Sequence, residues 1–411
     1  MVHNLSSLIT IIFFKMKFSA FLLLLIMFGC NLFAQPFQIG HTTITLFDLS
    51  RNNRSIPTEI YYPADVAGIN VPVTTLNNDK FPVIAFGHGF VMTWDAYQNI
   101  WDAVVPEGFV IAFPKTETGF SPSHAEFGKD LAFVISELSS LGQNNSSLFY
   151  NRIDSMNCVM GHSMGGGSSF LAAQFYPGIK SLVALSPAET NPSAIQASTY
   201  LTIPSLIYAG GNDCVTPPAT NQIPMYDSLN SSCKMFISII GGSHCQMAEN
   251  NLLCNFGESS CTPQPTISRA DQHLVINRYL LPWLKFELNG DCFSGVLFDS
   301  LISNDANINF QKSCVLCAAT TAIDAMYMAN LEVYPNPFSN KIMVNVNQSD
   351  LNNVHVDVCR VDGLNLPSND FVKSIENEKL IINLNDNLPT GIYFLHLSMA
   401  GMTSVKKMIK F

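Results

Sequence analysis

The sequence predicts a large α/β domain, with a mainly parallel sheet flanked by helices, followed by a small all-β sandwich. Up to about residue 288, short apolar runs alternate with longer amphipathic segments, which is typical of a parallel sheet covered on both faces. Over residues 331–411, apolar and polar residues alternate with period two between Asn, Asp, Gly and Pro, as in antiparallel strands. The 411 residues are enough for both domains.

The N-terminal segment has the pattern of an export signal. Residues 17–34 contain a lysine, an unbroken apolar run and a small residue at the end. This pattern predicts a secretory signal peptide over residues 1–34, cleaved near Ala34. The apolar run from Phe18 to Phe28 is too short to span a membrane. We therefore expect export through the inner membrane.

The elements of the larger domain, expected at residues 37–290, follow from the apolar runs. The strands are expected in TITLF, EIYYPA, PVIAFGHG, FVIAFP, NCVMGHS, SLVALSP, PSLIYAGG and KMFISIIGG. The helices are expected at Trp94–Val105, His124–Leu138, Met164–Phe175 and Ile267–Leu288. The first two strands are expected to form an antiparallel edge. Residues 291–330, rich in Ser, Asn, Ala and Thr, are expected to be a linker with some local structure.

One serine lies in the setting of a catalytic nucleophile. Residues 161–165 read GHSMG, with an apolar strand before them and a helical run after them. This is the context of a nucleophile elbow, a tight strand-to-helix turn that exposes Ser163. A side chain at either flanking glycine would collide with neighbouring backbone. The N-terminus of the helix would point its free N–H groups at the reaction site.

Two further strand ends supply an acid and a base in the chain order Ser, Asp, His. Asp213 follows the strand in PSLIYAGG, and His244 follows the strand in KMFISIIGG. Both lie just past the carboxyl end of a strand, the edge at which open α/β sheets bind ligands. Glu189, also at a strand end, is the second candidate for the acid. His162, beside the serine, is expected to have a structural role.

An oxyanion hole needs two N–H donors, and the sequence offers one after each of two strands. The first is the N–H of Met164, the residue after the nucleophile, and the second is the N–H of Phe90 in GHGF. The candidate substrate-binding residues are Phe90, Trp94 and Glu189. No metal or organic cofactor is called for.

The cysteines indicate disulfides near the predicted site. Ten of the 11 cysteines follow the expected cleavage site, an even number in an exported protein. Cys214 follows the expected acid and Cys245 follows the expected base, so a Cys214–Cys245 bridge would clamp the two loops. Cys233 lies at the other end of the last strand, roughly 20–30 Å from Cys245. It is therefore too far from Cys214 for a bridge. Cys254 and Cys261 are expected to close a local loop.

The CVLC stretch at residues 314–317 could be a redox or zinc half-site. It has no second CxxC beside it, so a structural bridge or free thiols are the favoured interpretation.

With these residues in place, residues 37–288 resemble the dienelactone hydrolase-like branch of the α/β-hydrolases, particularly secreted bacterial cutinases and polyester hydrolases. The stretches that carry the resemblance are GHGF, GHSMGGG, IPSLIYAGGNDCVTPP, PMYDSL and KMFISIIGGSH. The resemblance implies an α/β-hydrolase fold and a secreted serine ester hydrolase that acts through an acyl-enzyme on small or polymeric esters. Its implied site residues are Ser163, Asp213 and His244 in the triad, and Phe90 and Met164 at the oxyanion hole.

The resemblance alone does not imply that the substrate is a polymeric ester. Polyester hydrolases usually place a tryptophan after the strand that follows the elbow. Here that segment reads LSPAETNPSAIQ and contains no aromatic residue.

The C-terminal domain, residues 331–411, resembles the sorting domain of type IX secretion in Bacteroidetes. YPNPFSN, LPTGIYFLHL and a final KKMIK occur in that order. The resemblance implies contact with the type IX secretion machinery, passage across the outer membrane, and a secreted or cell-surface location. A carbohydrate-binding or adhesive sandwich is the alternative.

The charge composition narrows the classes of function that the protein can have. The net charge is −10 and no basic stripe occurs, which argues against nucleic-acid binding. A monomer is expected. Two alternatives to an esterase stay open, an extracellular serine peptidase or amidase of the same fold and a non-catalytic surface binding protein.

Overall fold

The computed structural model of the chain describes residues 37–75, 80–317, 332–345, 354–361, 364–367, 370–376, 379–399 and 402–411. The expected signal peptide lies outside these residues. In the part of the chain that is described, no helix combines the length and the apolar character needed to cross a bilayer.

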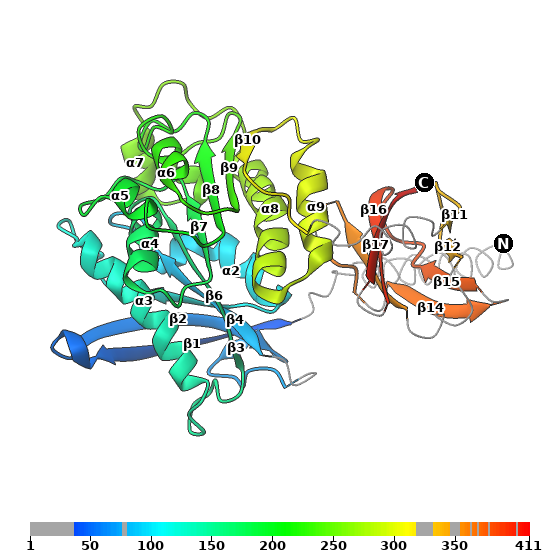
Figure 1. Cartoon of the computed structure of the whole chain (residues 1–411), viewed down its shortest axis with the longest axis horizontal. Helices are drawn as coiled ribbons and strands as arrows, with labels where there is room; N and C mark the ends of the chain where they lie inside the picture. Colours follow the sequence, from blue (N-terminus) through cyan, green and yellow to red (C-terminus); the bar gives the residue numbers. More distant parts are fainter. Residues whose placement is uncertain are drawn as a thin grey trace, which may run out of the picture. The chain divides into compact units, whose positions relative to one another are not determined.

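A ten-stranded sheet forms the centre of the larger domain, in the order β10-β9-β8-β7-β6-β4-β5-β2-β1-β3 (Figure 1). Its strands are β1 (Gln38–Asp48), β2 (Arg54–Ala64), β3 (Gly68–Ile69), β4 (Phe81–Gly87), β5 (Val110–Pro114), β6 (Ile153–His162), β7 (Ser181–Leu185), β8 (Ser205–Gly210), β9 (Lys234–Ile239) and β10 (Ile308–Lys312). The pairs from β5 through β4 and β6 to β9 are parallel. β1 and β2 form the expected antiparallel edge.

Helices cover both faces of this sheet, as the alternation of apolar runs predicts (Figure 1). They are α2 (Gln98–Val104), α3 (His124–Leu141), α4 (Met164–Phe175), α5 (Ala194–Ser198), α6 (Gln222–Ser228), α8 (Arg269–Asn289) and α9 (Cys292–Ile302). The short helix α7 (Leu252–Glu258) contributes only one buried residue, Glu258. Short 3-10 turns precede α2 at Trp94–Tyr97 (η3) and follow β9 at Cys245–Met247 (η5).

Each inner strand contributes to two hydrophobic cores. In β4, Ile84 and Phe86 join the core under α2, α8 and α9, whereas Val83 and Ala85 join the core under α3, α4, α5 and α6. Alternate side chains of a strand point to opposite faces, so a strand buried on both faces must be apolar throughout. The α/β prediction is confirmed.

The structure differs from the expected linker over residues 291–317. α9 packs its Phe298 and Ile302 into the core under α8, and β10 pairs with β9 at the edge of the sheet. Disulfides Cys233–Cys314 and Cys292–Cys317 fasten this segment, so the two cysteines of CVLC form structural bridges. The segment resembles a linker in sequence because β10 is an edge strand with mostly exposed side chains. The rest of the expected linker lies outside the described residues.

The C-terminal domain consists of two antiparallel sheets around one core. The sheets are β11-β12-β15-β14 and β13-β16-β17, built from β11 (Val333–Tyr334), β12 (Lys341–Val344), β13 (His355–Arg360), β14 (Phe371–Glu376), β15 (Lys379–Leu384), β16 (Gly391–Met399) and β17 (Met402–Lys410). Ile342 and Leu380 of the first sheet share a core with Val356 and Leu395 of the second. The all-β prediction is confirmed.

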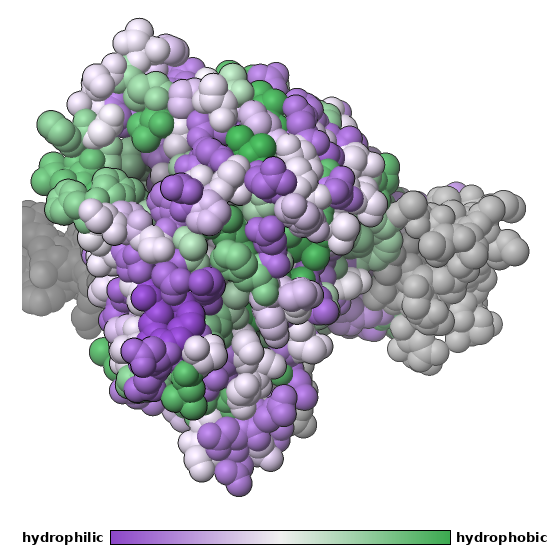
Figure 2. All heavy atoms as spheres, turned by 60° about the vertical axis from the view of Figure 1, so that its left-hand side comes forward, coloured by the Kyte–Doolittle hydropathy of each residue, from purple (hydrophilic) through white to green (hydrophobic). Residues whose placement is uncertain are grey.

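On the face of the molecule shown in Figure 2, hydrophobic residues gather in several separate groups among hydrophilic ones.

Candidate active site

Ser163 lies between the end of β6 and the start of α4 in a strained backbone conformation. Its φ is 54° and its ψ is −120°, a region that side-chain-bearing residues rarely adopt. Its N–H donates to the carbonyl of Leu185 at 3.0 Å, and its carbonyl accepts from the N–H of Ala188 at 2.9 Å. The end of β7 and the segment after it therefore hold the turn in place. The residue is 8% exposed.

Two glycines of the elbow are required by close backbone approach, as the sequence predicts. A Cβ on Gly161 would lie 2.4 Å from the carbonyl carbon of Gly165. A Cβ on Gly165 would lie 2.1 Å from the carbonyl oxygen of Gly87, at the end of β4. The first turn of α4 is thus pressed against the ends of β6 and β4.

His244 and Asp213 are hydrogen-bonded to each other. His244 Nδ1 lies 2.8 Å from Asp213 Oδ2, and both side chains are buried. Thr216 donates its N–H to Asp213 Oδ1 at 2.8 Å and its hydroxyl to Oδ2 at 2.9 Å. Because a carboxylate only accepts, the proton of the imidazole lies on Nδ1, and Nε2 is left as the basic nitrogen.

Thr216 was not foreseen from the sequence. Its signal is a threonine three residues after Asp213, the spacing at which an aspartate accepts hydrogen bonds from the backbone that follows it.

His162 brings the His244 loop against the elbow. The two imidazole rings lie 4.7 Å apart between centroids, and His162 Nε2 lies 3.2 Å from the carbonyl oxygen of His244. The hydroxyl of Thr216 also approaches the carbonyl of Ser186, which follows β7, at 3.3 Å. The structure therefore gathers Ser163, Asp213 and His244 at the carboxyl edge of β6, β8 and β9.

The two expected oxyanion donors lie on the loop after β4 and at the start of α4. Met164 is the first residue of α4, where backbone N–H groups lack a carbonyl four residues earlier. Phe90 follows Gly89 in the loop after β4, and this residue is 45% exposed. Its ring meets the ring of Phe120, which is 81% exposed, edge-on at 6.4 Å.

The other candidate residues lie in different surroundings. The carboxylate of Glu189 accepts from the N–H of Ile195 in α5 at 3.0 Å, whereas it is Asp213 that contacts His244. The ring of Trp94 packs against the core, with Lys115 Nζ 4.7 Å from its centroid. Within the described ranges, His, Cys, Asp and Glu side chains form no group of three that could hold a metal ion.

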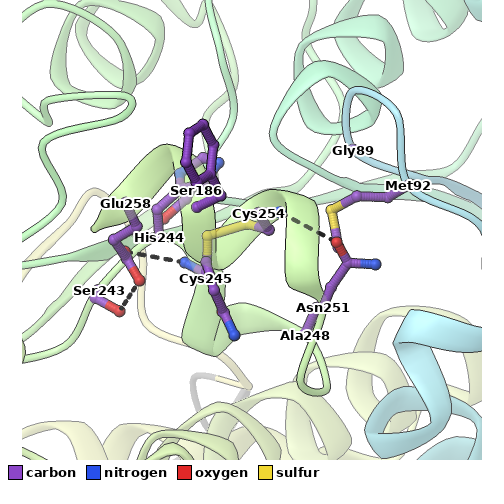
Figure 3. Close-up of a disulfide and its surroundings, with 12 residues drawn as sticks. Gly89, Met92, Ser186, Ser243, His244, Cys245, Ala248, Asn251, Cys254 and Glu258 are labelled. Atoms are coloured by element: carbon purple, nitrogen blue, oxygen red, sulfur yellow. Dashed lines mark hydrogen bonds between the residues drawn. A yellow bond between two sulfur atoms is a disulfide. The ribbon is translucent and has the colours of Figure 1, made fainter. Parts of the chain in front are cut away.

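The disulfides near the site differ from the expected pairing. The Cys214–Cys245 and Cys254–Cys261 predictions are wrong: Cys214 pairs with Cys261, and Cys245 pairs with Cys254. Their Cα–Cα distances are 5.5 and 5.7 Å. The reason is that each loop is bridged to the segment of α7 and the residues after it, and not to the other loop. Figure 3 shows the Cys245–Cys254 bridge.

Glu258 at the end of α7 adds a polar brace to this arrangement. Its buried carboxylate accepts from the hydroxyl of Ser243 and from the N–H of Cys245, both at 3.1 Å (Figure 3). The guanidinium of Arg269 donates to the carbonyl of Cys245. The residues on either side of His244 are therefore held by the same segment that carries Cys254.

Comparison with known proteins agrees with this architecture. Residues 37–261 match the family model described as PET hydrolase-like, and residues 332–410 match the model described as a secretion system C-terminal sorting domain. The C-terminal domain is thus a sorting domain, which indicates export with release or cell-surface attachment.

Characterised relatives match part of the chain. Cutinase 1 of Thermobifida cellulosilytica is 28% identical over 187 residues, which cover 45% of this chain and 64% of the relative. A cutinase of Thermobifida fusca (strain YX) is 28% identical over 187 residues, covering 45% of this chain and 56% of the relative. The bis(hydroxyethyl) terephthalate hydrolase of Streptomyces coelicolor is 26% identical over 187 residues, covering 45% and 54%. The match thus spans between about half and two thirds of each of these relatives. Because the family model matches more than half of its residues, the chain belongs to the PET hydrolase-like family.

Proposed function

We propose that the protein is a secreted serine carboxylic-ester hydrolase. Ser163 is the nucleophile, His244 is the general base, and Asp213 orients the imidazole. The observation that carries the proposal is the 2.8 Å hydrogen bond between His244 Nδ1 and Asp213 Oδ2. His244 also contacts His162, the residue directly before Ser163 in the strained elbow. A nucleophile, a base and a group that orients the base are the parts that acyl transfer requires.

The reaction proceeds in two halves. In the first half, His244 Nε2 takes the proton of Ser163 Oγ as the oxygen attacks the ester carbonyl carbon. The N–H groups of Phe90 and Met164 stabilise the oxyanion. The tetrahedral intermediate collapses, His244 protonates the leaving alcohol, and an acyl-enzyme remains. In the second half, His244 takes a proton from water as the water oxygen attacks the acyl carbonyl carbon. The tetrahedral intermediate then collapses, His244 returns the proton to Ser163 Oγ, and the acid is released.

We propose esters with apolar acyl groups as substrates, polymeric esters included. The exposed edge-on pair of Phe90 and Phe120 offers an apolar surface on the loops after β4 and β5. The names of the relatives, cutinases and a terephthalate ester hydrolase, support the same substrate class. Of the candidate substrate-binding residues, Phe90 has the surroundings that fit the role best. Trp94 is packed on the core, and Glu189 is engaged with α5.

The first test is hydrolysis of nitrophenyl esters, from acetate to long acyl chains, by the wild type and by Ser163→Ala. We expect the variant to lose kcat by roughly 10⁵- to 10⁶-fold. The chain length with the highest kcat/KM then reports the size of the acyl pocket, and release of soluble acid from a polyester film tests polymer cleavage. A folded wild type that turns over aminoacyl-anilides but no ester would establish the peptidase alternative instead.

A further inference from the structure

A buried chain of hydrogen bonds runs from the loop after β4 to the loop after β9. The N–H of Gly89 donates to Tyr97 Oη at 2.7 Å, and Tyr97 Oη lies 3.0 Å from His162 Nδ1. His162 Nε2 lies 3.2 Å from the carbonyl oxygen of His244. Tyr97 and His162 have no exposed surface. Tyr97 ends η3, 65 residues before His162 in the chain, so the fold and not local sequence brings these two side chains together.

The acceptors fix where each proton lies. The carbonyl of His244 can only accept, so His162 Nε2 carries a proton and donates it. In a neutral imidazole, Nδ1 then carries no proton and accepts a hydrogen bond from the Tyr97 hydroxyl. The phenol oxygen in turn accepts from Gly89. The thioether of Met92 lies 3.4 Å from the same hydroxyl and is the weaker acceptor.

The burial of Tyr97 and His162 keeps both side chains in the neutral form that these hydrogen bonds require. Desolvation lowers the pKa of His162 well below its usual value, and the neighbouring His244 lowers it further. Desolvation also raises the pKa of Tyr97. Both groups are therefore neutral at ordinary pH. Gly89 packs closely on the same groups, because a Cβ there would lie 2.7 Å from Met92 Sδ and 3.3 Å from Tyr97 Oη, and these side chains would have to shift.

We propose that Tyr97 and His162 are positioning residues that couple the oxyanion-hole loop to the catalytic base. One end of the chain holds Gly89, directly before Phe90, whose N–H is the proposed oxyanion donor. The other end holds the backbone of His244. His162, in the middle, directly precedes the nucleophile. The inference rests on the proposed ester hydrolysis and adds two residues that touch no substrate.

Tyr97→Phe tests the coupling with little change in volume. The variant leaves the buried N–H of Gly89 and Nδ1 of His162 without their hydroxyl partner. We expect kcat on nitrophenyl esters to fall roughly 10- to 100-fold with KM nearly unchanged, since small misplacements of catalytic groups have effects of that size. Inhibition by phenylboronic acid, which forms a tetrahedral adduct with Ser163 Oγ, should weaken by a similar factor.

Tyr62→Phe is the matched control. Tyr62 is also fully buried, and its hydroxyl donates to the carbonyl of Val71 at 2.7 Å, in the β2 region away from the site. It should lose stability but keep kcat. An active wild type whose Tyr97→Phe variant matches Tyr62→Phe in kcat would overturn the coupling alone. A wild type without esterase turnover would overturn the proposed function and the positioning role with it.

A measurement on the wild type covers the case in which Tyr97→Phe does not fold. Nitrogen-15 NMR of the histidine rings reports the tautomer and titration of each imidazole. We expect His162 to be neutral with its proton on Nε2 between pH 5 and 8. A His162 that titrates in this range, or one that carries its proton on Nδ1, would refute the coupling.

Discussion

Removal of the Cys214–Cys261 bridge, by alanine at both positions, tests how the acid loop is held. This bridge closes a loop with a sequence separation of 47 residues, whereas Cys245–Cys254 closes one of 9. On the chain-entropy model, the long loop restrains the unfolded state by about 4 kcal/mol and the short loop by about 2.6 kcal/mol at 25 °C. Loss of the long bridge should therefore lower the free energy of unfolding more than loss of the short one.

The thermal midpoint shows this difference directly. For a domain of this size, each kcal/mol of stability shifts the midpoint by roughly 2–4 °C. The Cys214→Ala/Cys261→Ala protein should thus melt roughly 3–6 °C below the Cys245→Ala/Cys254→Ala protein, as measured by circular dichroism. Both variants should lose kcat, because each bridge begins at the residue after a member of the predicted triad.

Peptide mapping under non-reducing conditions provides the control for the connectivity itself. The expected products join the peptide of Cys214 to that of Cys261, and the peptide of Cys245 to that of Cys254. A peptide that joins Cys214 to Cys245 would refute the reasoning. Equal melting points for the two alanine pairs would show that loop length does not set their contributions.

Two carboxylates yield further predictions. Glu258→Ala removes the acceptor of the Ser243 hydroxyl and the Cys245 N–H, so it should lower the free energy of unfolding in urea by about 2–4 kcal/mol and lower kcat. Glu258→Gln keeps an acceptor and should recover most of the stability and most of kcat. An Ala variant with unchanged stability and kcat would contradict the role of Glu258 as a brace. Burial raises the pKa of Glu287 from 4.5 to about 7, so the stability that this group contributes is complete below pH 4.5 and is lost as pH rises through 7. Glu287→Gln should therefore raise the urea midpoint at pH 8.5 and leave it unchanged at pH 5; an equal shift at both values would exclude this titration.

Much of the elbow and the sheet could be predicted because their signals are local. Residues 161–165 carry the glycines that close backbone approach requires, and the runs on either side identify a strand and a helix. Asp213 and His244 could be chosen because strand ends in a parallel sheet meet at one edge. Each of these inferences needs only a short window of sequence and one topological rule.

The disulfides and the hydrogen-bonded chain could not be predicted in this way. Spacing alone places Cys214 near Cys245, but it does not show that α7 lies beside both loops and carries Cys254. Likewise nothing near Tyr97 in the sequence points to His162, 65 residues away. Such contacts depend on how loops without periodic patterns cross the end of the sheet.

The two halves of the site are held by different forces. The elbow is fixed by packing, since α4 presses on β4 so closely that no Cβ fits at Gly165. The loops of Asp213 and His244 lie beyond the strand ends, and two disulfides, Glu258 and His162 hold them. A mild reductant that breaks these two disulfides should therefore loosen the loops of Asp213 and His244 before it affects the elbow. It follows that reduction would lower the reactivity of Ser163 through its base while the strained turn around the serine stays intact.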